Sequence, residues 1–281
     1  MRKYTKSRKK PFEKNTRQVI KMFIIDTDVI KEMAVKDKRI DKRKFEEYRK
    51  AEIEPDVVTS AEGSARVKLG NTEVVAGIKM DLAEPYPDTP EEGTMSVAVE
   101  FVPLASPEFE SGPPREDSIE VSRVVDRAIR ESKMVDFKKL CVTPGEKVWM
   151  VFIDIDIINN DGNLIDACGL AAASALVNAK IPEIDKDGNP DYTKKKDKLP
   201  VSGVALSTTF AKIGRKIMAD PNLSETEAMH GRLTVGTIEK DKKIQLCSMQ
   251  KGGTASFSLE EIEQIIEMAE KKGTELRKLV K

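Results

Sequence analysis

The residues with the clearest potential for chemistry lie where a strand pattern passes through a turn into an alanine-rich helix pattern. Residues 147–157 predict a strand, Asp161-Gly162-Asn163 a turn and residues 164–179 a buried helix. Free N–H groups at such a helix start often bind an anion. Here Asp161 and Asp166 bracket the start with no Lys or Arg between them. We therefore expect both carboxylates to repel phosphate and to satisfy the helix N–H groups themselves.

A row of arginines is the second candidate site. A helix is predicted over residues 117–133, and Arg123, Arg127 and Arg130 would share one of its faces because they are spaced by four and three. Guanidinium groups suit the phosphates of a nucleic-acid backbone. Pairing within the helix is an equally good interpretation, because acidic residues stand three or four positions away: Glu120, Asp126 and Glu131. Arg115, in the preceding loop, is a weaker candidate.

Other reactive side chains give no site. His230 is the only histidine, and without a nucleophile elbow it is predicted to lie in a turn. The Lys-Gly-Gly run at 251–253 lacks the spacing of a phosphate loop and is interpreted as a turn between strands. Three cysteines far apart predict neither a disulfide framework nor a zinc site, and they favour a reducing compartment: Cys141, Cys168 and Cys247.

Composition narrows the class of protein. The chain has 281 residues, with 48 Lys plus Arg and 48 Asp plus Glu, so its zero net charge excludes a globally basic nucleic-acid binder but not a local basic site. A charged fraction of 34% is typical of ion-pair networks and weakly favours a heat-adapted source. No apolar run could span a bilayer, and the N-terminus lacks the apolar region of a signal peptide. We expect a cytoplasmic protein.

The elements that must position these residues follow from hydrophobic periodicity. In the first half we expect a short helix over 24–33, a polar connection over 39–48, and strands at 65–69, 73–80 and 95–102. Residues 183–200 are charged and predict a surface excursion. A second set of strands then precedes a final helix over 259–280 that Ser258 caps: 203–210, 215–219, 232–238, 243–249 and 253–257.

Residues 1–21 differ from the rest of the chain. They contain nine Lys or Arg, one acid and no sustained apolar periodicity, so we interpret them as a disordered basic arm before a domain over 22–281. Such an arm could contact RNA phosphate. A passive tail and a misplaced start codon are together the preferred alternatives, because Met22 begins an ordinary N-terminal helix pattern.

Several segments together resemble the RNase PH family, which includes bacterial RNase PH, polynucleotide phosphorylase and the ring subunits of exosomes. The strongest are the DGN-x-x-DA run at 161–167 and the GPP-helix segment at 112–130; shorter pieces are 61–65, 101–107 and 200–220. The resemblance implies an α+β, RNase PH-like fold of two βαβα-type units, as in the second domain of ribosomal protein S5, with mixed sheets packed around central helices. The units would span 22–200 and 201–281.

The resemblance also says where a phosphate would bind. Active members of the family hold it with a Gly-Ser-Arg run at the start of the alanine-rich helix, and the aligned positions here are Asn163, Leu164 and Ile165. Phosphorolysis brings a phosphate dianion beside anionic RNA, so positive charge must offset their repulsion. Because Ile165 supplies none, we expect a degenerate phosphate motif and no catalytic residue in this chain.

Active members further carry two carboxylates that could act as a general acid or hold a divalent metal. Asp220 matches the first, although a simple loop residue before Pro221 is the preferred interpretation. The second position falls on Thr226, between Glu225 and Glu227, and a one-residue slip could restore a carboxylate.

The retained and lost motifs together resemble the silent ring subunits of archaeal exosomes. The resemblance implies a ring of three silent and three active subunits, capping subunits with RNA-binding modules, and single-stranded RNA rather than DNA as the other partner. Inorganic phosphate and any divalent metal would serve the active partner, with no cofactor or metal in this chain. It also favours RNA contact for Arg123 and Arg127, and less so for Arg130. The alternatives are a self-sufficient phosphorolytic enzyme and a purely structural subunit.

Overall fold

Alternating β-branched residues build the first sheet. In the computed structural model, which describes residues 27–280 (of residue 196 only the backbone), its order is β1-β2-β3-β6-β4, with β5 paired to β6. β4 runs parallel to β6 and the other pairs are antiparallel. The strands are β1 (Ala51–Pro55), β2 (Gly63–Leu69), β3 (Thr72–Ala83), β4 (Thr94–Phe101), β5 (Cys141–Thr143) and β6 (Lys147–Asn159).

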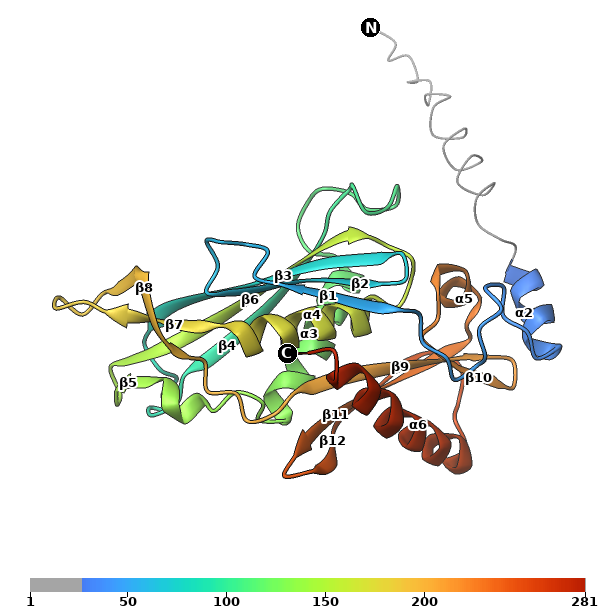
Figure 1. The fold of residues 1–281 in the computed structure, drawn as a ribbon. Coiled ribbons are helices and arrows are strands. Elements are labelled where there is room, and N and C mark those ends of the chain that lie inside the picture. Colours follow the sequence, from blue (N-terminus) through green and yellow to red (C-terminus); the bar gives the residue numbers. More distant parts are fainter. Residues whose placement is uncertain (1–26, 281) are drawn as a thin grey trace, which may run out of the picture.

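Two central helices lie under this sheet (Figure 1). They are α3 (Glu116–Glu131) and α4 (Leu164–Asn178), and the short helix η1 (Phe137–Leu140) follows α3. Small side chains let α4 approach the strands closely: a Cβ on Gly63 of β2 would lie 2.5 Å from the backbone oxygen of Ala175. α4 is therefore buried on almost every side, as its alanine-rich sequence predicts.

The second sheet covers the other side of α4. Its strands, in the antiparallel order β10-β9-β11-β12, are β9 (Ala205–Ile213), β10 (Lys216–Ala219), β11 (Gly231–Lys240) and β12 (Lys243–Gly253). α6 (Leu259–Arg277) packs on the far face, so β9 is buried on both faces. Ser258 caps α6 in a capping box with Glu261, which confirms the predicted helix start.

Two short helices close one end of the molecule beside the second sheet. α2 (Thr27–Val35) packs on α5 (Leu223–Ala228) through Ile30, Ala34 and Ala228. This contact fixes α5 next to the start of α4, where the candidate site lies. The predicted α+β fold, with sheets packed around central helices, is confirmed.

Several strands and one helix were not predicted where the sequence is polar. The surface excursion at 183–200 is a hairpin of β7 (Lys180–Ile184) and β8 (Pro190–Lys198), whose charged residues hide the strand pattern. No strand covers 253–257, and the 251–253 run ends β12 instead of turning between strands, because Gly253 takes φ +74°. β1 and α5 were not predicted. The basic arm over 1–21 lies outside the described residues, and the division near residue 200 stays a prediction.

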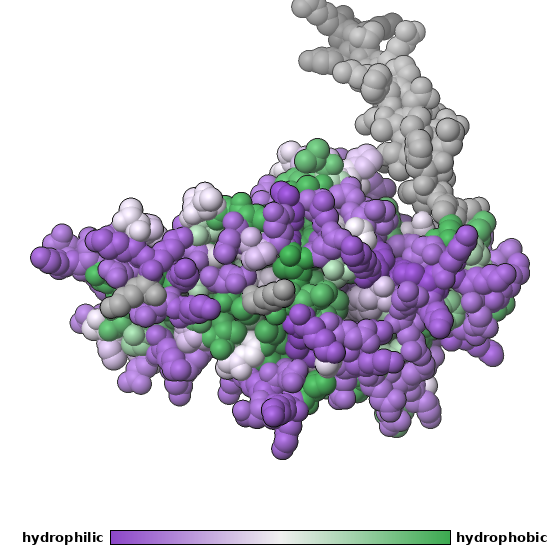
Figure 2. Space-filling view, in the orientation of Figure 1, coloured by the Kyte–Doolittle hydropathy of each residue, from purple (hydrophilic) through white to green (hydrophobic). Residues whose placement is uncertain are grey.

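The surface is dominated by polar and charged residues. Figure 2 shows this for one face, with apolar residues gathered near its middle. No helix among residues 27–280 is long and apolar enough to cross a membrane.

Candidate functional site

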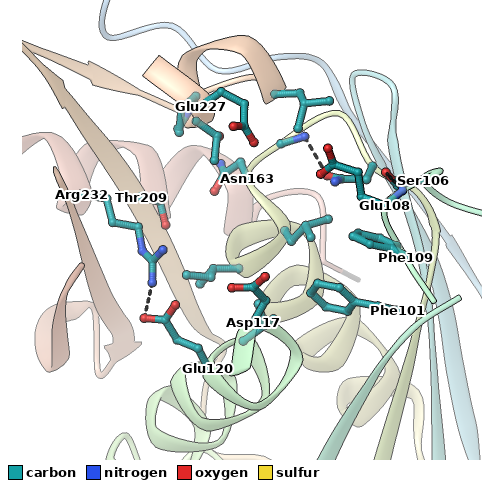
Figure 3. A pocket seen from close by; sticks show the side chains of 18 of the residues that line it. Phe101, Ser106, Glu108, Phe109, Asp117, Glu120, Asn163, Thr209, Glu227 and Arg232 are labelled. Carbon is teal, nitrogen blue, oxygen red and sulfur yellow. Dashed lines mark hydrogen bonds and ion pairs between the residues drawn. The ribbon is translucent and has the colours of Figure 1, made fainter. Parts of the chain in front are cut away.

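A cavity of about 810 Å³ lies beside the start of α4, where the two sheets and α3, α4 and α5 meet (Figure 3). The loop after β4 contributes Glu108 and Phe109, and α3 contributes Asp117 and Glu120. The second sheet and the α5 segment close the other side with Thr209, Arg232, Leu223, Thr226, Glu227 and Met229. Segments distant in sequence therefore converge on one hollow.

The three positions of the degenerate phosphate motif lie together at this cavity. Asn163, Leu164 and Ile165 all line it, as the predicted location requires. Ile165 is only 5% exposed and presents an aliphatic surface, so no cation stands where the motif would place one.

The charges around the cavity are predominantly negative. Four carboxylates line it, from Glu108, Asp117, Glu120 and Glu227, against one guanidinium among the described lining residues, that of Arg232. The guanidinium is already ion-paired with Glu120, shown by the dashed line in Figure 3. Desolvation raises the pKa of Glu227, and the charges of Glu108 and Asp117 raise it further. An anion entering here would meet net repulsion.

A left-handed turn forms one wall of the cavity. Gly162 and Asn163 take φ values of +81° and +54° between β6 and α4. A Cβ on Gly162 would lie 2.4 Å from the backbone of Asn222, so glycine is required both by the conformation and by the close approach. The turn thereby brings the start of α4 against the residues that lead into α5.

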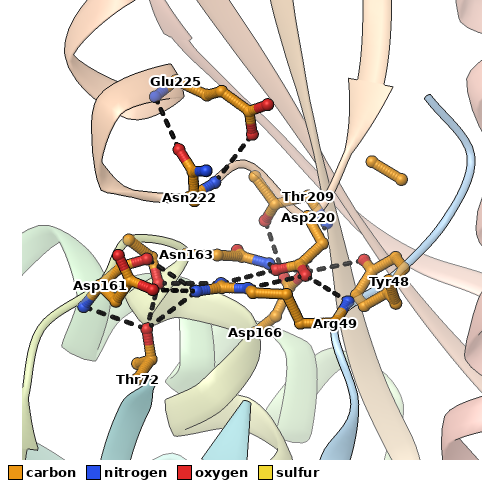
Figure 4. A network of polar contacts seen from close by, with 12 residues as sticks. Tyr48, Arg49, Thr72, Asp161, Asn163, Asp166, Thr209, Asp220, Asn222 and Glu225 are labelled. Atoms are coloured by element: carbon orange, nitrogen blue, oxygen red, sulfur yellow. Dashed lines mark hydrogen bonds and ion pairs between the residues drawn. The ribbon is translucent and has the colours of Figure 1, made fainter. Parts of the chain in front are cut away.

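Behind this turn lies a buried polar network (Figure 4). The side-chain amide of Asn163 donates to Asp220 at 2.7 Å and to Asp166 at 2.8 Å. Asp220 also accepts from Arg49 at 2.8 Å and from Arg43 at 2.9 Å. Burial alone would raise the pKa of Asp220, but the hydrogen bonds and charge of Arg49 outweigh burial and hold that pKa below its usual value. Asp220 is a loop residue, as preferred from sequence, but a fully buried one.

The predicted capping of α4 by its flanking carboxylates is wrong. Asn163 is the N-cap and makes no side-chain cap. Asp166 instead accepts from the hydroxyl and backbone N–H of Thr209 at 2.7 and 2.9 Å, and from the hydroxyl of Tyr48 at 2.8 Å. Asp161 pairs with Arg49 at 3.5 Å. Both carboxylates therefore bind residues from distant segments. These contacts hold the start of α4 against its neighbours.

Burial raises the pKa of Asp166 to about 6, although the hydrogen bonds from Asn163, Thr209 and Tyr48 oppose the shift. Burial and the neighbouring charges of Asp166 and Asp220 raise the pKa of Tyr48 well above its usual value. The network thus holds one carboxylate that stays ionised and one that titrates under mildly acidic conditions.

The second carboxylate position is not restored by a one-residue slip to Glu225. That side chain is buried, forms a capping box with Asn222 and accepts from Arg39 at 2.8 Å. Thr226 donates its hydroxyl to the backbone of Asn222. Thr226 and Glu227 line the cavity, whereas Glu225 and Asp220 do not. The candidate pair of carboxylates therefore does not face a common space.

The arginine row of α3 is brought together on the surface, but its members differ. Arg123 is exposed and has no hydrogen-bond or ion-pair partner within residues 27–280. Among the described residues, the Arg127 side chain has one hydrogen-bond partner, the side chain of Gln250 on β12 at 3.3 Å. Arg130 forms a bidentate pair with Asp126, the nearest bond at 2.7 Å, and Arg115 pairs with Glu110. Contact with RNA stays a prediction, and the geometry favours the first two arginines for it.

The arginines that organise the site were not predicted from the sequence. The segment predicted as a polar connection contains Arg39 and Arg43, and Arg49 directly follows it. Arg232 was not predicted as a site residue either. The carboxylates that they bind at the site lie far away in sequence, so no spacing could reveal these pairs. The basic character of residues 38–50 was the only available signal.

The remaining candidates form no site. His230 is exposed in the turn before β11, as predicted, and its Nδ1 accepts from the backbone of Gly214. All three cysteines are free. Within residues 27–280, no three side chains of His, Cys, Asp or Glu come together in a way that could hold a metal ion.

Comparison with known proteins agrees with this arrangement. Residues 47–182 and 203–272 match domains 1 and 2 of the 3′ exoribonuclease family, RNase PH. The exosome complex component Rrp42 of Pyrococcus furiosus is 46% identical over 256 residues, covering 90% of this chain and 91% of that protein. The Methanothermobacter thermautotrophicus protein of the same name is 46% identical over 249 residues, covering 84% of this chain and 91% of that protein.

Solved structures give the same answer. A chain of the Archaeoglobus fulgidus exosome with RNA bound to the active site superposes with a TM-score of 0.84 and 44% identity, covering 91% of this chain and 97% of that one. A chain of an archaeal exosome core gives 0.80 and 39%, with 94% and 98% covered. The chain therefore belongs to the RNase PH family of 3′ exoribonucleases.

Proposed function

We propose that this chain is a non-catalytic subunit of an archaeal RNA exosome, a phosphorolytic 3′-to-5′ exoribonuclease. The observation that carries the proposal is the acidic cavity at residues 163–165. It holds four carboxylates and one guanidinium that is already paired. A phosphate dianion that enters beside anionic RNA needs compensating cations, and this cavity supplies repulsion instead.

The place in an exosome is supported by the relatives. Proteins that match most of this chain carry the name exosome complex component Rrp42, and a similar structure is described as an exosome with RNA bound. The proposed assembly is a cytoplasmic ring of three silent and three active subunits with capping subunits that carry RNA-binding modules. Inorganic phosphate, and a divalent metal if one is used, act in the active subunit.

Contact with RNA is the proposed contribution of α3. Arg123 and Arg127 present guanidinium groups that protein acids leave largely unengaged. Such groups can hold the phosphates of a single strand and guide it to the neighbouring active subunit. Glu120, Arg123 and Arg127 are spaced by three and four, so the row adjoins the wall of the cavity.

Phosphorolysis assays of separate and mixed subunits test the proposal. The purified chain, an active homologue and their mixture are each incubated with single-stranded RNA and inorganic phosphate, and nucleoside diphosphates are quantified. We expect no release by this chain alone and a higher rate for the mixture than for the homologue alone. Release by this chain alone would instead support a self-sufficient enzyme, and a mixture no faster than the homologue would argue against a shared ring.

A further inference from the structure

The acidic cavity has the properties of a binding site for a cation with apolar parts. Its volume of about 810 Å³ lies within the range of ligand sites. Phe101, Phe109, Leu164 and Met229 supply apolar walls, and carboxylates stand among them. Glu108, Asp117 and Glu227 have no cationic partner within the described chain. Carboxylates crowded together in this way favour a bound positive charge.

An unpaired acceptor at the cavity wall is an independent sign of a ligand. Asn163 is only 6% exposed, and its Oδ1 has no hydrogen-bond partner. The amide cannot simply be turned over, because its Nδ2 donates to both Asp166 and Asp220, and two carboxylates require the NH₂ group on their side. Oδ1 therefore stays an acceptor at a cavity-lining residue. Buried acceptors of this kind are normally satisfied, and none of the described residues donates to this one.

The chain itself carries a suitable occupant near this place. Residues 1–21 contain nine Lys or Arg and one acid, with Tyr4 and Phe12 among them. The described chain begins at α2, which packs on Ala228 and Met229 beside α5, and Met229 also lines the cavity. Because an extended chain spans about 3.3 Å per residue, the 26 residues before Thr27 are easily long enough to reach the cavity. Attachment also gives the segment an effective concentration on the order of millimolar.

We propose that the basic segment 1–21 docks in this cavity in its own chain, with lysine or arginine donors against Glu108, Asp117, Glu227 and the Oδ1 of Asn163. The position where active relatives would hold phosphate thereby serves as a docking site for a basic peptide. The proposal goes beyond the function in an exosome and does not depend on it. It also gives residues 1–21 a role that neither a passive tail nor a contact with RNA would supply.

Zero-length cross-linking of the full chain tests this docking. A carbodiimide joins a lysine amine to a carboxylate in direct contact, and mass spectrometry identifies the joined peptides. We expect links between lysines of residues 1–21 and Glu108, Asp117 or Glu227 of the same chain. A mixture of isotopically light and heavy protein distinguishes links within one chain from links between chains. Links to carboxylates elsewhere, links between chains only, or no links from this segment would overturn the proposal.

Tryptic cleavage within residues 1–21 provides a second readout. The double variant Glu108→Gln/Glu227→Gln should be cut there about fivefold to tenfold faster than the natural sequence, the change expected for the loss of two exposed ion pairs. The matched control is Glu263→Gln/Glu267→Gln on α6, which removes two exposed acids away from the cavity and should leave the rate unchanged. High salt should accelerate cleavage of the unmodified chain in the same way. Equal rates for all three proteins, with no effect of salt, would contradict docking.

Discussion

The carboxylates on the two sides of Asn163 differ in burial and in charge balance: those behind it are buried and paired, whereas Glu108, Asp117 and Glu227 in front of it are exposed. Behind the residue, Asp220 is matched by Arg43 and Arg49, and every hydrogen bond to its carboxylate is between 2.7 and 2.9 Å. In front of it, the carboxylates of the cavity outnumber the guanidinium of Arg232. The same turn thus separates charge that holds the fold together from charge that excludes an anion. The matched side stabilises the fold, and the unmatched side is the basis of the proposed loss of phosphorolysis.

Removal of the central charge of the matched side should have the largest effect. Asp220→Asn leaves Arg43 and Arg49 without their buried partner, and loss of one member of such a pair costs about 3–5 kcal/mol. The thermal midpoint should fall by on the order of 10 °C. Calorimetry or circular dichroism measures the shift. Asp88→Asn, in an exposed loop, is the matched control and should change it little. Equal midpoints for both variants would show that the network does not stabilise the fold.

The two carboxylates that Asn163 bridges should also respond to pH with opposite signs. The pKa of Asp166 is raised from 3.8 to about 6, so its contribution to stability is present at low pH and is lost as the pH rises between these values. The loss should be at most about 3 kcal/mol. The pKa of Asp220 is lowered, so its contribution exists above 3.8 and is lost as the pH falls below that value.

A variant that cannot titrate isolates the first effect. The thermal midpoint of the natural sequence minus that of Asp166→Asn should decrease as the pH rises from 3.8 to about 6. The variant has one acceptor oxygen in place of two, so it no longer accepts from both the Tyr48 and the Thr209 hydroxyl, which adds an offset independent of pH. A difference that stays constant or grows over this interval would contradict an elevated pKa.

On the unmatched side, a cation alone should not restore phosphate binding. Ile165→Arg places a guanidinium at the degenerate motif, but the neighbouring carboxylates still repel the anion. Combining it with Glu108→Gln/Glu227→Gln should strengthen phosphate affinity by roughly tenfold to a hundredfold over the single variant, because each removed charge contributes about 1 kcal/mol. Isothermal titration with inorganic phosphate measures the difference. Equal affinity in the two proteins would mean that the acids do not control the site.

The smallest effect is expected at the arginine row. In the assembled ring, Arg123→Ala/Arg127→Ala should weaken binding of single-stranded RNA severalfold and reduce the slope of log affinity against log salt by about 0.7 per lost phosphate contact. Arg115→Ala/Arg130→Ala removes arginines that already pair with Glu110 and Asp126, so this matched variant should lose less. Equal losses of RNA affinity in the two variants would show that the paired arginines contribute as much to RNA binding as the free ones. No change in either would favour a purely structural subunit.

Periodicity predicted most of the elements that carry the site. The alternation of β6, the alanine-rich α4 and the spacing on α3 are local signals, and all three elements formed with bounds close to those expected. The placement of Leu164 and Ile165 at a common cavity followed from the resemblance. The hairpin of β7 and β8 was not predicted because many of its residues are charged and do not alternate between apolar and polar.

Partners across long sequence separations could not be predicted. Asp161 and Asp166 were predicted to accept from the nearest helix N–H groups. In the structure Asp161 pairs with Arg49, and Asp166 accepts from Thr209 and Tyr48. The net charge of the cavity likewise sums residues from four segments, none of which is unusual alone. They contribute the acids Glu108, Asp117, Glu120 and Glu227 and the single cation Arg232. Only the fold brings these charges together.

Inorganic phosphate binding to the unmodified chain tests the central claim most directly. Crystals of the protein are soaked in phosphate, and the region beside Asn163 and Ile165 is inspected. The acidic, aliphatic cavity predicts no ordered phosphate there, even at concentrations that saturate an active relative treated in parallel. A phosphate seated against residues 163–165 would show that the cavity can hold the attacking anion and would contradict the non-catalytic assignment.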